Sequence, residues 1–435
     1  MKLFLKLKMI FNINKRLAPL LLGASVGASS AFSVACASSN APAAATETPE
    51  GVLPAGKGDP FDVPLDGVSK EQVATFDDGD NLFGLPLRDA DGLGPLYTRS
   101  SCGACHREAT RGPGFVQKMS AVGPDGLTPL ADQSEKLPFG NTVHPLVTAG
   151  AKTPIVPPAD DPSIKVSTRV GPPVLGRGYM EAILDSEIER MQDEQSVRDD
   201  AIHGRVNHVV YASVRNPDRT FHDHSKGEKL LGRFGLKARV ATLDDFTADA
   251  MQGDMGITSP LRPEEFPNPD GLLDDLKPGV DVTADSVNLR ANYMRLIAIP
   301  RRPTAAAVAV ALFSQAKCDV CHAPSLHTSA DYPLAMLADI DAPVFTDLLL
   351  HDMGDALSDG VRDIDGEAGP RDWRTAPLVG LRFNRSFLHD GRAASVRDAI
   401  VAHDDPSAES YESAELFLAL SKRDQQTLLD FVEAL

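Results

Sequence analysis

Four of the five cysteines in the 435-residue chain fall into two short strings of the same form. The strings are Cys102-Gly-Ala-Cys105-His106 and Cys318-Asp-Val-Cys321-His322. Cys-x-x-Cys-His is the form of a c-type haem attachment site, in which both thiols join the vinyl groups of the haem and the histidine becomes the proximal iron ligand. The sequence therefore predicts two covalently bound haem c groups.

Two other kinds of site use paired cysteines. Two Cys-x-x-Cys pairs can form a four-cysteine zinc site, but a histidine after each pair would then be a coincidence. A thioredoxin-like redox pair needs neither the adjacent histidine nor an exported chain. Haem attachment accounts for all six residues and is the interpretation we follow.

The N-terminus predicts export. Residues 1–16 carry Lys2, Lys6, Lys8, Lys15 and Arg16, and Leu17 to Ala31 is apolar and small. A basic start, a short apolar stretch and a small-residue cleavage signal at Ser33-Val-Ala35 are typical of a secretory signal peptide, which we assign to residues 1–36. The apolar stretch is too short for a stable transmembrane span.

The fifth cysteine leaves two arrangements open. Cleavage just before Cys36 would expose it as an N-terminal lipid anchor, an arrangement that resembles a bacterial lipoprotein. Cleavage near Ala35 or Ala37 would instead leave an ordinary exported chain. Residues 37–59, which contain an Ala/Pro/Thr run, are expected to form a flexible linker in either case. The predicted location is the periplasm, or the outer membrane as a lipoprotein facing the periplasm or the outside.

The charge balance excludes one class of partner. The chain carries 43 Lys+Arg and 61 Asp+Glu, a formal net charge of −18. Binding to nucleic-acid phosphates needs a basic face, so we expect no nucleic-acid partner. The 33 prolines and 34 glycines predict long irregular connections between modest helices.

The two halves of the chain repeat one another. Leu96-Tyr97 and Leu312-Phe313 precede the two cysteine strings at equal spacing, and each string is followed by an Arg/Pro segment: Arg169-Val-Gly-Pro-Pro-Val-Leu-Gly176 and Arg374-Thr-Ala-Pro-Leu-Val-Gly380. Ser421 to Asp424 has the form of a helix start, with apolar residues following at helical spacing. We predict a first haem c domain with long insertions over residues 60–300 and a second, cytochrome c-like domain over 301–435.

Several longer strings resemble a known family. Trp373 to Leu381, Phe387-Leu-His-Asp-Gly-Arg392 and Val396-Arg-Asp-Ala-Ile400 are similar to the second-haem domain of bacterial di-haem cytochrome c peroxidases. The closer resemblance, carried also by Leu231–Ala238, Gly253–Thr258 and Asp347–Gly354, is to the di-haem oxidoreductase family, described as peroxidases and sometimes labelled thiol oxidoreductases. Because cytochrome c modules wrap short helices around haem, we expect a mostly α fold of two cytochrome c-like haem domains with extensive loops.

The resemblance also implies ligands for the second haem. The peroxidase relatives take the distal ligand of their electron-transfer haem a short way beyond the His-Asp-Gly motif, often as methionine. Here that step leads from His389 to His403, which is the candidate sixth ligand opposite His322. A surface position beside Asp404 and Asp405 is the alternative for His403. The resemblance further implies that His389 and Arg392 lie near the haem propionates, although Asp390-Gly391 also fits a simple turn.

For the first haem, Glu181 is the candidate acid–base residue. It lies in Gly178-Tyr-Met-Glu-Ala-Ile183, where the second half has its Phe-Leu-His string, and a peroxidase needs a group that moves a proton between peroxide oxygens. Met180 as a sixth ligand, or an ordinary helix with Glu181 in water, are the alternatives. His351 and Met353 are weaker ligand candidates, and Trp373 is either a relay or a core residue.

Together these features predict an exported di-haem c-type oxidoreductase of peroxidase type. The second haem would receive electrons from a small redox protein or a membrane donor, and the first would pass them to a small-molecule oxidant such as hydrogen peroxide. The alternative is a non-catalytic di-haem electron-transfer cytochrome. Some relatives hold Ca²⁺ between their domains, so Ca²⁺ is a further cofactor that the resemblance implies.

Overall fold

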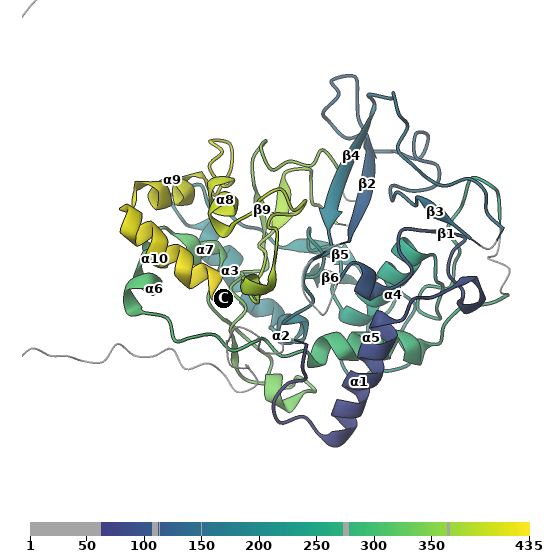
Figure 1. Ribbon diagram of the computed structural model, residues 1–435, viewed down its shortest axis with the longest axis horizontal. Helices are drawn as coiled ribbons and strands as arrows, with labels where there is room; N and C mark the ends of the chain where they lie inside the picture. Colours follow the sequence, from purple (N-terminus) through teal and green to yellow (C-terminus); the bar gives the residue numbers. More distant parts are fainter. Residues whose placement is uncertain (1–61, 107–111, 113, 149, 273–277, 363–365) are drawn as a thin grey trace, which may run out of the picture. The chain divides into compact units, whose positions relative to one another are not determined.

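The computed structural model describes residues 62–435, except for 107–111, 113, 149, 273–277 and 363–365 (Figure 1). The predicted signal peptide, Cys36 and the linker at 37–59 lie outside these residues. The described residues belong to one compact unit, 43–435. Nothing in this unit tests the predicted boundary at residue 300, which stays a prediction.

The prediction of a mostly α fold is wrong. Helices account for 31% of the described residues and strands for 14%, so turns and irregular segments are the largest class. Within the described ranges, the longest helix, α1, has 15 residues, and every sheet has two strands. Prolines and glycines interrupt regular structure throughout the chain because proline lacks a backbone donor and glycine loses more backbone entropy on ordering than other residues.

The helices lie in the order α1 (Lys70–Gly84), α2 (Arg177–Ala182), α3 (Asp185–Ser196), α4 (Leu243–Met255), α5 (Ala284–Leu296), α6 (Ala307–Gln315), α7 (Cys318–Cys321), α8 (Val396–Val401), α9 (Tyr411–Ala419) and α10 (Lys422–Glu433). Short 3₁₀ turns occur at η1 (Asp89–Asp91), η2 (Cys102–Ala104), η4 (Ala335–Leu337) and η5 (Leu381–Phe383). None of the described helices is both long and apolar enough to span a bilayer.

The strands pair only as antiparallel couples: β1 (Leu96–Tyr97) with β3 (Leu146–Val147), β2 (Phe115–Ala121) with β4 (Ile164–Val170), β5 (Asn207–Val210) with β6 (Lys229–Gly232), β7 (Leu326–His327) with β8 (Asp341–Ala342), and β9 (Leu350–Asp352) with β10 (Asp372–Arg374). The β2–β4 pair is the longest, and its register joins Phe115 to Val170. It therefore delivers the chain directly into the Gly171-Pro172-Pro173 segment.

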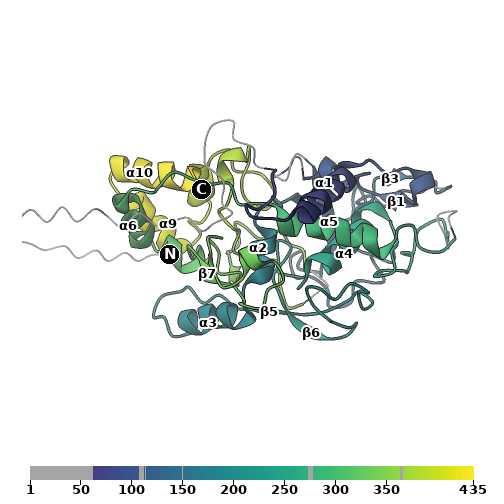
Figure 2. The same ribbon diagram turned by 90° about the horizontal axis from the view of Figure 1, so that it is seen from below.

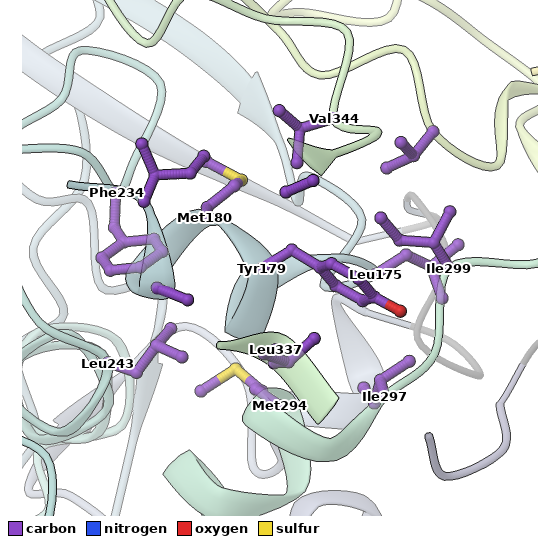
Figure 3. Close-up of a cluster of buried hydrophobic side chains, with 14 of the residues drawn as sticks. Leu175, Tyr179, Met180, Phe234, Leu243, Met294, Ile297, Ile299, Leu337 and Val344 are labelled. Atoms are coloured by element: carbon purple, nitrogen blue, oxygen red, sulfur yellow. The ribbon is translucent and has the colours of Figure 1, made fainter. Parts of the chain in front are cut away.

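The two largest hydrophobic clusters of the described residues hold most of the helices. The larger contains Tyr179 and Met180 of α2 together with Met294 of α5 and Ile297 just after it (Figure 3). α5 also packs against α1 and α4 (Figure 2). The second core joins α6, α9 and α10 through Phe313, Phe417 and Leu428.

Local sequence signals explain where several helices begin. Ser421 caps α10 by accepting a hydrogen bond from the backbone N–H of Asp424, which confirms the predicted helix start. Thr242 caps α4 and Ser395 caps α8 in the same way. α8 ends two residues before His403, so its position determines where that histidine lies.

Candidate haem sites

The first cysteine string folds into a tight turn. Cys102–Ala104 form η2, which Ser101 caps, and the backbone N–H groups of Cys105 and His106 both donate to the Cys102 carbonyl, at 3.0 and 2.9 Å. Both sulfurs and the imidazole are therefore carried by a single turn of the chain. Neither Cys102 nor Cys105 is in a disulfide.

His106 is oriented by one backbone contact. Its Nδ1–H donates to the carbonyl oxygen of Pro172 at 2.6 Å, which leaves Nε2 to face a metal. Burial lowers the His106 pKa, although the Pro172 contact opposes this, so the neutral form that ligates iron is favoured. A hydrogen bond of this kind holds the ring and strengthens it as a ligand.

Two glycines allow the chain to approach the first site closely. A Cβ added at Gly114 would lie 2.6 Å from the sulfur of Cys105, and one at Gly171 would lie 2.7 Å from the Cys105 carbonyl oxygen. Only residues without a side chain fit here. The two cysteines, the oriented His106 and this close backbone approach suit a haem bound by c-type attachment.

The second cysteine string forms a single helical turn, α7. The backbone N–H of His322 donates to the Cys318 carbonyl at 2.9 Å, and Lys317, with φ +55°, reverses the chain just before the turn. Nδ1 of His322 contacts the Phe345 carbonyl at 3.3 Å. Each half of the chain therefore directs Nδ1 of its histidine to a backbone carbonyl.

A cavity of about 260 Å³ lies against the second string. One water molecule needs only ~10–15 Å³ of such space, so the cavity is far larger than a packing defect. The lining includes Cys318, Cys321, His322, His403, His389, Trp373, Arg374, Arg177, Pro172 and Pro173. The structure thus brings His403 to the cavity that holds His322.

His403 resembles the proximal histidines in its hydrogen bonding. Its Nδ1 contacts the Ala399 carbonyl at 2.7 Å, inside α8, and no described residue bonds its Nε2. Burial and the neighbouring His403 together lower the His322 pKa to about 4. Two neutral imidazoles that line one cavity could both ligate the iron of a haem held there. The ligand role of His403 stays a prediction.

His389 and Arg392 lie in different surroundings. The His389 ring stacks on Trp373, with ring centroids 3.9 Å apart, and lines the cavity. Arg392 is half exposed, and it donates to the Asp390 carboxylate and to the Ala356 carbonyl. Their predicted place near the propionates is not tested by these contacts.

Glu181 is buried in a network of its own. Its carboxylate accepts hydrogen bonds from Arg295 at 2.6 and 3.0 Å, from the Tyr332 hydroxyl at 2.9 Å and from the Leu243 backbone at 2.8 Å. Burial raises its pKa, but Arg295 outweighs this and the pKa is lowered. The adjacent Met180 contacts Arg177 through its sulfur at 3.1 Å.

His351 forms a second buried cluster beside Cys321. Its Nε2 contacts Asp347 at 2.9 Å and its Nδ1 contacts Glu409 at 2.7 Å. Burial alone would lower the His351 pKa, but the Cys321 sulfur and the Asp347 carboxylate raise it well above its ordinary value. Cys321, Asp347 and His351 form the one metal-ligand grouping within the described ranges, and the predicted Ca²⁺ remains untested.

Sequence reasoning missed the arginines of the sites. Arg177 and Arg374 both line the cavity and are 5% exposed. Arg290 is buried at the first site, where it lies against the Cys102 thiol and donates to Ser286. Arg374 and the segment before Arg177 stand in the repeated Arg/Pro strings, which was the available signal, but only tertiary packing shows which arginines turn inward.

The two sites share a wall. Pro172 accepts the hydrogen bond of His106 at the first site and also lines the cavity of the second. The backbone N–H of Val170, just before it, donates to the His389 carbonyl at 2.8 Å. The four residues from Val170 to Pro173 therefore contact the His106 side chain of the first site, and the His389 backbone and the cavity of the second.

Comparison with curated proteins finds no match. Among solved structures, hydrazine synthase of Kuenenia stuttgartiensis, in a crystal pressurised with xenon, is 14% identical with a TM-score of 0.37. That alignment covers 88% of this chain and 95% of the other. The TM-score is too low to establish a shared fold.

A family model described as "Di-haem oxidoreductase, putative peroxidase" matches residues 159–435, which is more than half of the chain. The match contains the second cysteine string, the cavity and the Arg/Pro segments of both halves, and it begins after the first string. The haem chemistry inferred from the two strings and from the cavity agrees with this description. The chain belongs to the di-haem oxidoreductase family.

Proposed function

We propose that this chain is an exported di-haem c-type oxidoreductase that receives electrons at the second haem and delivers them through the first haem to a small oxidant such as hydrogen peroxide. One observation carries the proposal: His322 and His403 line one cavity, each with Nδ1 on a backbone carbonyl. This arrangement suits an electron-transfer haem with two protein ligands at the second site and leaves catalysis to the first.

A haem with two protein ligands carries an electron, whereas one with an open axial position can bind peroxide or oxygen. The chain's own residues hold these groups in place. The Cys102–Cys105 and Cys318–Cys321 thiols would anchor the porphyrins, and the Pro172 and Phe345 carbonyls hold His106 and His322 as neutral ligands. The Pro172–Pro173 wall supports direct electron transfer, because this one short segment contacts His106 at the first site and lines the cavity of the second.

The proton needed at the first haem is assigned to Glu181 in this proposal. Because its pKa is lowered, Glu181 is ionised at neutral pH and would accept a proton before it donates one. The Arg295, Tyr332 and Leu243 contacts would keep the carboxylate in one position. A structural role for the same contacts is the competing explanation, and the variant described below separates the two.

We also propose an electron donor and a cellular location for the protein. Its electron donor would be a small redox protein or a membrane component on the outer side of the inner membrane, and the strongly acidic chain would not bind nucleic acid. The location would be the periplasm, or the outer membrane through a lipid on Cys36.

The proposal is tested by haem counting and spectroscopy of the purified full chain. A pyridine-haemochrome assay should give two haems per chain, and electron paramagnetic resonance should show one low-spin centre and one that is high-spin in some redox state. Steady-state assays should then show peroxide reduction. If both centres stay low-spin in every redox state, the chain is a non-catalytic electron-transfer cytochrome.

The Glu181→Gln variant tests the proton role. We expect peroxide turnover to fall about 10²-fold or more while both haems are retained, because general acid–base catalysis contributes that much. Glu187→Gln, which removes a surface ion pair with Arg190, is the matched control and should leave turnover unchanged. If turnover in Glu181→Gln falls only as far as the loss of folded haem protein, Glu181 has a structural role and no part in proton transfer.

A further inference from the structure

Arg177 and Arg374 are two buried cations on the wall of one cavity. Arg177 begins α2 and Arg374 ends β10, so they come from opposite halves of the chain. Both are 5% exposed, and both line the cavity that holds His322 and His403. The fold therefore brings two guanidinium groups to a single cavity.

Neither guanidinium has a carboxylate partner among the described residues. Arg177 donates to the Pro173 carbonyl at 2.5 Å and contacts the Met180 sulfur, whereas Arg374 donates to the carbonyls of Gly235 and Thr375 at 3.0 and 2.7 Å. These acceptors satisfy some N–H groups but carry no negative charge.

Two other buried arginines of the described chain each contact a carboxylate directly. Arg169 contacts the Asp359 carboxylate at 2.8 Å, and Arg295 contacts Glu181 at 2.6 Å. The fold therefore gives these two buried guanidiniums a direct carboxylate contact that Arg177 and Arg374 lack, although Glu409 also lines the cavity.

A buried cation without an anion is costly, and a second cation beside it adds repulsion. Burial, reinforced by Arg374, lowers the Arg177 pKa to about 9, and burial lowers the Arg374 pKa to about 10 although the Asp347 carboxylate opposes this. An anion in the cavity would remove both penalties. A haem carries two propionate carboxylates, and the planar fork of arginine matches a carboxylate in two parallel hydrogen bonds.

Arg177 also lies close to the first site. It donates to the carbonyl of Pro173, and His106 donates to the carbonyl of the preceding residue, Pro172. The charge of Arg177 contributes to the lowered pKa of His106. Arg374, on β10, has no comparable link to His106.

We propose that Arg177 and Arg374 bind the propionates of the second haem, and that Arg177, on the shared wall, sets the reduction potentials of both haems. The inference rests on the two haems of the proposed function, but not on the oxidant that the enzyme reduces. Both arginines act as positioning and electrostatic residues, because they neither ligate iron nor contact the oxidant.

Spectroelectrochemical titration of the purified di-haem protein tests this assignment. Replacing either arginine by glutamine leaves a propionate charge near the iron uncompensated, which favours the oxidised form. In Arg374→Gln, the ratio of reduced to oxidised second haem at the wild-type midpoint should fall about tenfold, or ~59 mV for one electron. The first haem should be unchanged. In Arg177→Gln, the ratio should fall for both haems.

Arg190→Gln is the matched control, since it removes a half-exposed arginine that pairs with Glu187 and Glu194 on α3. It should leave both potentials at their wild-type values. Unchanged potentials in Arg177→Gln and Arg374→Gln, with both haems present, would overturn the assignment. A shift of the first haem in Arg374→Gln but not in Arg177→Gln would overturn the shared role of Arg177.

Lysine variants give a second measurement in case the glutamine variants do not acquire both haems. Arg177→Lys and Arg374→Lys keep the charge but lose the two-pronged hydrogen bond, so the propionate bending bands in resonance Raman spectra should shift, whereas Arg190→Lys should leave them in place. Bands that stay at their wild-type positions in all three variants would contradict propionate binding.

Comparing the measured potentials with peroxide reduction distinguishes a failure of propionate binding from a failure of the proposed reaction. If the potentials shift as described but peroxide is not reduced, propionate binding stands and the proposed reaction fails. If haem counting finds no haem, the proposed function fails and the arginines have no propionate to bind.

Discussion

His106 and His322 are both oriented by a hydrogen bond from Nδ1 to a backbone carbonyl. Each directs Nδ1 to a backbone carbonyl, at 2.6 Å to Pro172 and 3.3 Å to Phe345, and His403 does so with Ala399 at 2.7 Å. Since Nδ1 must carry the proton in these contacts, Nε2 is the nitrogen left for a metal in all three. One hydrogen bond per ring thus selects the tautomer that ligates iron.

Replacing His403 by methionine tests its predicted ligand role. Methionine opposite histidine raises the potential of a haem relative to two histidines, so the second haem of His403→Met should become easier to reduce. Potentiometric titration should show the rise, and the exposed His208→Met should leave the potential unchanged. An unchanged potential and spectrum in His403→Met would mean that another group is the sixth ligand.

Short elements position these side chains. α7 is one turn, α8 is six residues long, and β9 and β10 have three residues each. Elements of this length are not stable alone, so tertiary contacts must hold them. The β9–β10 pair is a clear case: His351 on β9 is joined to Asp347 and Glu409, and Trp373 and Arg374 on β10 reach the cavity.

The His351 cluster predicts a pH-dependent stability. A haem-bonded Cys321 sulfur carries no charge, but the Asp347 carboxylate still raises the folded-state pKa of His351, so the stabilisation is fully present below the unfolded value of ~6.5 and is lost as the pH rises through the folded pKa. His351→Gln should reduce the free energy of unfolding by about 3–5 kcal/mol, because it breaks a buried pair. The difference between variant and wild type should shrink by up to ~1.4 kcal/mol per pH unit above ~6.5.

Denaturant titration of both proteins between about pH 6 and pH 9 measures this difference. Glu228→Gln, which removes the exposed partner of His224, is a control that should change stability by less than about 1 kcal/mol. A constant difference across the pH range would show that His351 is not charged in the folded protein.

The close backbone approach at the first site predicts a selective loss of haem. In Gly171→Ala the new methyl group would lie 2.7 Å from the Cys105 carbonyl oxygen, so the attachment turn would have to shift. Mass spectrometry should find mainly chains with one haem, attached at Cys318 and Cys321. Gly253→Ala has open space around its Cβ and should retain two haems. Full occupancy in Gly171→Ala would show that the turn adapts.

For the chain as a whole, the four residues from Val170 to Pro173 connect the functional parts. They begin with the last residue of β4, contact His389, orient His106 and line the second cavity. The proposed intramolecular electron transfer and the proposed role of Arg177 both depend on this shared wall. A di-haem enzyme whose two sites share so short a segment can couple them without any large rearrangement.

The N-terminal proposal is tested by fractionation of cells that express the full chain. If Cys36 carries a lipid, the wild type should sediment with the outer membrane, and Cys36→Ser should appear in the soluble periplasmic fraction. Cys36 belongs to neither Cys-x-x-Cys-His string, so haem content and peroxide reduction should not change. A wild-type protein found entirely in the soluble fraction would favour ordinary cleavage near Ala35 or Ala37.

The sequence alone determined the features that depend on neighbours in the chain. The Cys-x-x-Cys-His strings, the caps of α10, α4 and α8, and the family resemblance all rest on residues only a few positions apart. Attachment chemistry and helix capping are local, because a thiol, a hydroxyl or an N–H group must reach a partner within one turn.

Only the tertiary structure decided the balance of helix and loop, the shared wall and the inward turn of Arg177 and Arg374. His106 and Pro172 are 66 positions apart, and Arg374 donates to a carbonyl 139 positions earlier. The expectation of a mostly α fold failed for the same reason, since short antiparallel pairs and irregular segments are stabilised by distant partners and leave no periodic signal. Burial of a charge is a property of the packed molecule, so no spacing of arginines along the chain could reveal it.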